Sequence, residues 1–171
     1  MRWLQRILLF LVFALLLSAC QPVVQDSRPN GETLAYQVTD TVITAFFQLK
    51  IERTMVTRNL NDYIPVERNA LLLALDLMIE NRSDNTLPMS YADFQLIYKD
   101  DSGKEQILYP LEPFLEMQFP DTYTIGKNDI KSGTLVFQIP KDLQQIQLQY
   151  QEIYEDDFQG NRHLIEILLI D

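Results

Sequence analysis

Cys20 is the only cysteine of the 171-residue chain, and the residues before it suit a cleavage that would leave it at a new amino terminus. Two arginines begin the segment, residues 7–17 form an almost unbroken apolar run, and the small residues Ser18 and Ala19 follow. A secretory signal peptide has this layout, with small residues before the cut. The thiol of a cysteine after such a cut can carry a lipid through a thioether bond.

The four residues Leu17, Ser18, Ala19 and Cys20 resemble the lipobox of bacterial lipoproteins at every position. The resemblance implies transfer of a diacylglyceryl group to the Cys20 sulfur and cleavage between Ala19 and Cys20. A single acyl chain holds a protein at a membrane only marginally, whereas two chains hold it firmly. An uncleaved membrane-spanning helix is a poorer interpretation, because spanning takes about 20 apolar residues and this run is shorter.

Other candidate chemistry is sparse. His163 is the only histidine, and a Ser–His–Asp triad would need it as the base. It follows a glycine–asparagine–arginine turn, so we expect it to cap a terminal strand at the surface. One histidine and one cysteine exclude a cysteine-based zinc site or a multi-histidine metal cluster.

The densest acidic patch consists of Glu152, Glu155, Asp156 and Asp157. Carboxylates bind calcium, but the alternating aspartate spacing of a calcium loop is missing. We therefore expect a solvated loop between two strands, with cation binding around Asp156 left open. No metal and no cofactor are predicted.

Residues 109–120 combine three prolines with aromatic side chains and a methionine. Prolines suit an edge strand or an exposed connection, and aromatic residues and methionine are enriched where proteins bind partners. One interpretation is a crossover between sheets that places Phe114 and Phe119 in the core. The other is a partner-contact surface marked by Tyr109, Phe114 and Tyr123.

Composition narrows the classes of partner. Residues 1–19 hold two of the 14 basic residues and no acid, so the 152 residues from Cys20 onward have a formal net charge of −12. Nucleic acid binding depends on neutralising phosphates with Lys and Arg, so it is excluded. Since Cys20 would carry the lipid, no thiol remains for a disulfide, and the domain must depend on its apolar core.

Period-two patterns dominate the rest of the chain. Between Ala70 and Glu80 every odd position is Leu or Ile, and Asn81 begins a turn-forming stretch. A polar loop, 100–104, containing Gly103 separates two further alternating runs and predicts a hairpin.

The chain is expected to have three parts. The signal peptide would cover 1–19, the lipidated cysteine and a flexible tether 20–32, and a β domain 33–171.

With roughly seven to nine short strands and no long amphipathic helix, the domain is expected to be all-β, as two packed antiparallel sheets. Residues 73–81, 93–96, 101–104 and 133–140 resemble the telokin-like, immunoprotective extracellular domain of Gram-positive lipoproteins. The likeness covers about residues 40–150 and implies an immunoglobulin-like antiparallel β-sandwich. That family is largely of unknown function, and it supplies no catalytic residues.

The sequence thus predicts a lipoprotein tied to the cell membrane through the Cys20 diacylglyceryl group, on its extracytoplasmic face. The expected function is a non-catalytic binding or accessory module, with a protein of the cell envelope as a possible partner. Two alternatives stay open: a carboxylate-based hydrolase of a cell-wall polymer, and an acidic cation-binding domain.

Overall fold

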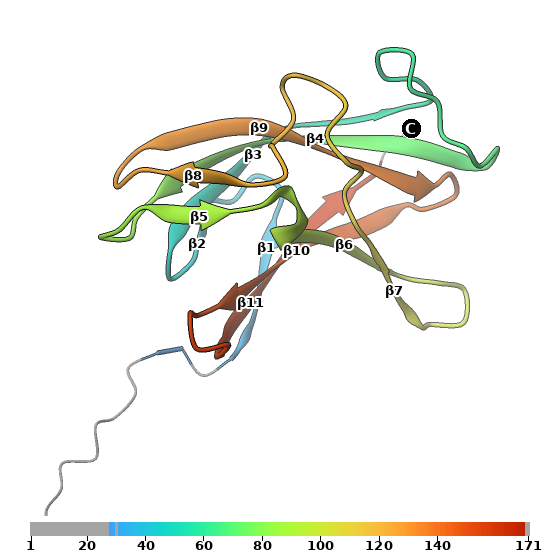
Figure 1. Cartoon of the computed structure of the whole chain (residues 1–171). Helices are drawn as coiled ribbons and strands as arrows, with labels where there is room; N and C mark the ends of the chain where they lie inside the picture. The colour runs from blue at the N-terminus through green and yellow to red at the C-terminus, as the bar shows by residue number, and fades with distance from the viewer. Residues whose placement is uncertain (1–27, 30, 170–171) are drawn as a thin grey trace, which may run out of the picture.

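The structure is a computed structural model that describes residues 28–29 and 31–169, and it contains two packed sheets with a small third one beside them (Figure 1). Within these residues the chain forms strands and a single 3₁₀ turn, η1 (Tyr91–Asp93). The strands are β1 (Thr33–Gln37), β2 (Val42–Ile43), β3 (Phe47–Thr57), β4 (Ala70–Asn81), β5 (Leu87–Met89), β6 (Phe94–Lys99), β7 (Glu105–Leu108), β8 (Tyr123–Ile125), β9 (Ile130–Pro140), β10 (Gln145–Ile153) and β11 (Gln159–Leu168).

One sheet has the order β1-β11-β10-β6-β7, the other β2-β3-β4-β9, and β5 pairs with β8 alone. The predicted all-β sandwich is therefore confirmed. The described residues hold eleven strands rather than seven to nine, because β2, β5 and β8 have only two or three residues each. One pairing is not antiparallel: β1 lies parallel to β11, with Thr33 opposite Arg162.

Strand β4 shows how the alternating pattern produces the sandwich. Leu73, Leu75, Leu77 and Ile79 point into the core between the sheets and are fully buried. Side chains from β6, β10 and β11, such as Leu148, meet them from the opposite sheet. Since complete burial of one such side chain contributes about 1.5–3 kcal/mol, this layer dominates the stability of the fold.

The other face of β4 is also partly covered. Leu72 and Ala74 pack with Val136 of β9 against side chains of the connections at 60–63 and 111–114. The segment 111–119 runs along the free edge of β9, where Val136 O accepts from Leu111 N at 2.7 Å and Thr134 O from Phe119 N at 3.2 Å. An edge covered in this way cannot pair with another chain.

The predicted hairpin around Gly103 is confirmed in detail. The hairpin β6–β7 turns at residues 100–104, where Gly103 has a φ of +80° that favours glycine. One carboxylate oxygen of Asp100 accepts from Ser102 N at 2.9 Å and from Lys104 N at 3.0 Å, which closes the loop.

Candidate functional site

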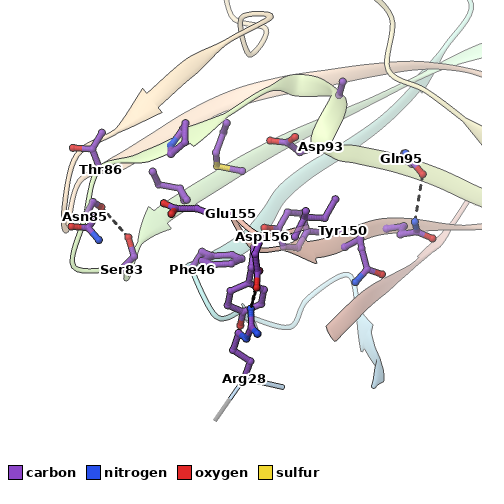
Figure 2. Close-up of a pocket in the computed structure, with 18 residues that line it drawn as sticks. Arg28, Phe46, Ser83, Asn85, Thr86, Asp93, Gln95, Tyr150, Glu155 and Asp156 are labelled. Carbon is purple, nitrogen blue, oxygen red and sulfur yellow. Dashed lines mark hydrogen bonds and ion pairs between the residues drawn. The ribbon is translucent and has the colours of Figure 1, made fainter. Parts of the chain in front are cut away.

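A cavity of about 700 Å³ lies between β5 with η1 on one side and the end of β10 on the other (Figure 2). We call it the β5–β10 cavity. Its walls come from four separate stretches of the chain: residue 28, residue 46, and segments within 83–95 and 149–156. The large apolar and aromatic residues of its lining are Phe46, Leu87, Pro88, Met89, Tyr150, Ile153 and Tyr154. Its polar lining includes Arg28, Ser83, Asn85, Thr86, Asp93, Gln95, Gln149, Gln151, Glu155 and Asp156.

The aromatic wall is held by ring contacts. The ring of Phe46, just before β3, lies 4.9 Å from that of Tyr154, and Tyr150 meets Phe47 edge-on at 4.6 Å between ring centroids. Tyr150 is buried because it continues the inward face of β10. Rings packed against one another in this way form a rigid surface, and so the cavity wall is preorganised.

Asp93 is the carboxylate of the opposite wall (Figure 2). It closes a capping box, in which Ser90 N donates to Asp93 at 2.7 Å and Ala92 N donates to the Ser90 hydroxyl at 3.1 Å. Although the residue remains exposed overall, desolvation by the surrounding wall raises the pKa of the Asp93 carboxyl, and the bond from Ser90 N opposes this rise.

At the rim, Arg28 reaches the turn between β10 and β11. Its Nη1 donates to both carboxylate oxygens of Asp156, at 2.8 and 2.7 Å. Hydrogen bonding from Arg28 lowers the pKa of Asp156, the opposite direction from Asp93. A carboxylate hydrolase needs one acid that stays protonated, and among these two only Asp93 is shifted that way.

The acidic patch predicted as one solvated loop is divided by the fold. Glu155, Asp156 and Asp157 are exposed in the β10–β11 turn, but Glu152 is 1 % exposed and belongs to β10. The residues that the structure describes contain no group of three or more His, Cys, Asp or Glu side chains placed to hold a metal ion.

The expectation that His163 caps a strand at the surface is wrong. His163 is 1 % exposed on the inward face of β11, and its Nε2 lies 2.9 Å from Glu152 Oε1. Its Nδ1 lies 3.3 Å from the Tyr36 hydroxyl. The ring is therefore enclosed in the core, because β11 places Ile165 and Ile167 inward and position 163 shares their face. It packs beside the ring of Tyr150, at 6.2 Å between centroids, but does not itself line the β5–β10 cavity.

The three side chains predicted to mark a partner surface are not equivalent. Tyr109 is 63 % exposed, whereas Phe114 is half-buried and stacks on Tyr63 at 4.5 Å between ring centroids. Tyr123 is only 9 % exposed and stacks on buried Phe119, so most of its side chain is withdrawn from the surface. Its hydroxyl has no hydrogen-bond partner within the described part of the chain, and burial raises the pKa of its phenol. A contact role for Tyr109 and Phe114 stays a prediction.

The predicted cleavage signal, Leu17, Ser18 and Ala19, and the predicted lipid attachment at Cys20 lie outside the described residues. Over residues 28–29 and 31–169, no helix has the length and apolar character needed to cross a membrane.

The fold and its cavity define the class as a two-sheet β-sandwich protein. The chain belongs to the family described as a domain of unknown function, DUF4352, whose model matches residues 36–160. No curated protein matches the chain.

Solved structures share the fold. A candidate lipoprotein, ycdA, of Bacillus subtilis matches with a TM-score of 0.60 and 19 % identity over 75 % of this chain, which spans only 38 % of that one. The yjhA protein of the same organism has a TM-score of 0.53 and 14 % identity, covering 77 % of this chain and 98 % of its own. A functionally unknown protein of Listeria monocytogenes has a TM-score of 0.54 and 11 % identity, covering 77 % of this chain and 82 % of its own.

Proposed function

We propose that this protein is a lipid-anchored binding module on the extracytoplasmic face of the cell membrane, and that its β-sandwich receives a partner segment in the β5–β10 cavity. Two features support the anchor: the lipobox-like residues up to Cys20, and a fold shared with a protein described as a candidate lipoprotein. The partner is a protein of the cell envelope that offers an apolar side chain to the cavity.

The cavity is the observation that carries the proposal. Its volume of about 700 Å³ falls within the range of about 300–1,000 Å³ found for binding pockets. Its wall combines rings, including Phe46 and Tyr154, with polar side chains such as Asp93. Aromatic walls of this kind bury an inserted side chain, and the polar groups set its orientation.

Binding is a better reading of this site than catalysis. His163, the single histidine, bonds to Glu152 inside the core and does not line the cavity. Asp156 at the rim is ion-paired with Arg28, and Asp93 is occupied by the backbone of Ser90. The carboxylates of Asp156 and Asp93 are thus already engaged by partners within the chain, whereas a general acid or base must be available to the substrate.

A photocrosslinking experiment in the cells that make the protein tests this proposal. The photoreactive residue p-benzoyl-phenylalanine replaces Ala92, an exposed residue of η1 that lines the cavity, in the full-length chain. Irradiation is expected to produce a discrete higher-mass adduct in the membrane fraction.

The matched control places the same residue at Val66, which is 90 % exposed in the β3–β4 connection and does not line the cavity. This position is expected to give no such adduct. Adducts of equal yield and pattern from both positions, or none from Ala92, would overturn the binding function.

A further inference from the structure

The side chain of Arg28, which lies between the predicted anchor and the first strand, is seated on the turn that joins β10 to β11 (Figure 2). Its guanidinium carbon lies 4.2 Å from the centre of the Phe158 ring and 5.5 Å from that of Tyr154. Its Nη1 donates to both oxygens of Asp156, 128 residues further along the chain. The contact therefore combines a carboxylate with two aromatic faces around one cation.

These are the two features by which proteins recognise a guanidinium group. Carboxylate oxygens accept its N–H groups, and an aromatic face attracts the delocalised cation. An ammonium group is a compact, strongly hydrated charge and uses a ring face and a carboxylate less well together. Tyr154, Asp156 and Phe158, which we call the arginine site, thus match arginine better than lysine.

The arginine site is formed by the turn itself. Tyr154 N donates to Phe158 O at 3.0 Å, and Asp157 N donates to Tyr154 O at 2.9 Å. The two rings meet edge-on at 5.7 Å between centroids. Because none of these contacts involves Arg28, the turn keeps its shape when the arginine leaves.

We infer that Tyr154, Asp156 and Phe158 form a binding site for the arginine side chain of a basic partner segment, and that Arg28 fills this site as an internal ligand. Tyr154 and Asp156 also line the β5–β10 cavity, so the inference rests on the proposed function. It adds that the partner segment bound there carries a positively charged arginine. Glu155 beside them, and a chain whose formal net charge is −10, favour the approach of a basic segment.

Binding of a partner arginine would therefore compete with Arg28, which is part of the amino-terminal segment. A partner arginine must displace Arg28, whose own attachment through the chain keeps it at a high local concentration. Removing Arg28 is therefore expected to strengthen, and not weaken, the binding of an added arginine side chain. A contact that served only to hold the amino-terminal segment would not have this property.

The test uses the chain from residue 20 onward with Cys20→Ser, with and without Arg28→Ala. The probe is N-acetyl-arginine amide, and the readout is the movement of the NMR signals of Tyr154 and Phe158 during titration. The Arg28→Ala variant is expected to give saturable shifts at both rings, with an affinity several-fold higher than that of the chain retaining Arg28. N-acetyl-citrulline amide, which has the same shape without the charge, is expected to give none.

Two variants serve as controls. Arg82→Ala removes an exposed arginine that pairs with Glu80 at 2.9 Å, and it is expected to leave the affinity for the probe unchanged. Adding Asp156→Asn to Arg28→Ala is expected to abolish the ring shifts while the thermal unfolding transition is retained.

Absence of saturable shifts in Arg28→Ala, or equal affinity with Arg28 present, would overturn the inference. Crosslinking from Ala92 does not depend on Arg28, so a negative titration would not contradict binding in the cavity. Conversely, absence of the crosslinked adduct would not contradict a positive titration at the arginine site.

Discussion

Glu152 is a carboxylate enclosed in an apolar core, and its contacts join β10 both to β11 and to the segment before β3. Its Oε1 accepts from Ala45 N at 2.8 Å and lies 2.9 Å from His163 Nε2, while its Oε2 accepts from Asn161 N at 2.9 Å. A buried charge is tolerated only when its hydrogen bonds are complete. Gly160 makes room for this arrangement, because a Cβ atom there would lie 2.5 Å from Glu152 Oε2.

Replacing Glu152 by Gln is predicted to lower the free energy of unfolding by about 3 kcal/mol. The amide has one acceptor oxygen, so its NH₂ group must face either the N–H of Asn161 or the donors of Ala45 and His163. Urea denaturation at neutral pH measures the loss. Glu155→Gln, an exposed position three residues away, is the control and is expected to stay within about 0.5 kcal/mol. Equal stability of the two variants would mean that the buried carboxylate does not secure the core.

At the scale of elements, the proline-rich crossover protects the free edge of β9. Phe119 at its end is buried and lies over Gly133 of β9, where a Cβ atom would come within 2.9 Å of the ring. The same ring stacks on Tyr123 of β8 at 5.2 Å between centroids. Gly133 is therefore required because the crossover packs directly on the backbone of the strand.

Gly133→Ala is accordingly predicted to destabilise the fold by about 1–3 kcal/mol, because the added methyl group must push Phe119 out of its site. The midpoint of urea unfolding reports this change, and it should fall with an unchanged slope. Ser132→Ala, at an exposed neighbouring position, is expected to leave the midpoint nearly unaltered. A Gly133→Ala protein as stable as the parent would show that the crossover moves aside freely.

At the scale of the whole molecule, the proposed anchor is separate from the fold that presents the cavity. Arg28 lies eight residues after Cys20, and eight extended residues span at most about 29 Å. If Cys20 carries the lipid, the contact of Arg28 with Asp156 keeps the β10–β11 turn within about that distance of the membrane. Displacement of Arg28 would let the cavity move away from that surface.

Cys20→Ala is predicted to abolish incorporation of a radioactive fatty acid and to release the protein from the membrane fraction, because two acyl chains provide most of the membrane affinity. Labelling of growing cells, followed by fractionation, measures both effects. Val24→Ala, in the same segment, should keep the label and the membrane location. A Cys20→Ala protein that still carried label would identify another residue as the attachment site.

Sequence patterns predict those parts of the fold that depend only on residues close together in the chain. The period-two run of β4 and the glycine-containing turn after β6 follow the predicted bounds closely. The same period-two alternation also indicates that Glu152 and His163 are buried, because each lies two residues from an inward-facing residue, Tyr150 and Ile165 respectively. Polar residue types favour exposure in a sequence, yet Glu152 and His163 are buried because each provides a hydrogen-bond partner for the other inside the core.

The sequence by itself determined an all-strand sandwich, an acidic surface and a single cysteine behind an apolar segment, because composition and period-two alternation are local properties. Only the tertiary structure decided that Tyr123 is buried, that β1 joins β11 in parallel, that separate stretches enclose the β5–β10 cavity, and that Arg28 meets Asp156. Alternation says which side chains share a face of a strand, but not which segment covers that face. That choice is made by contacts between residues far apart in the chain, which no local pattern records.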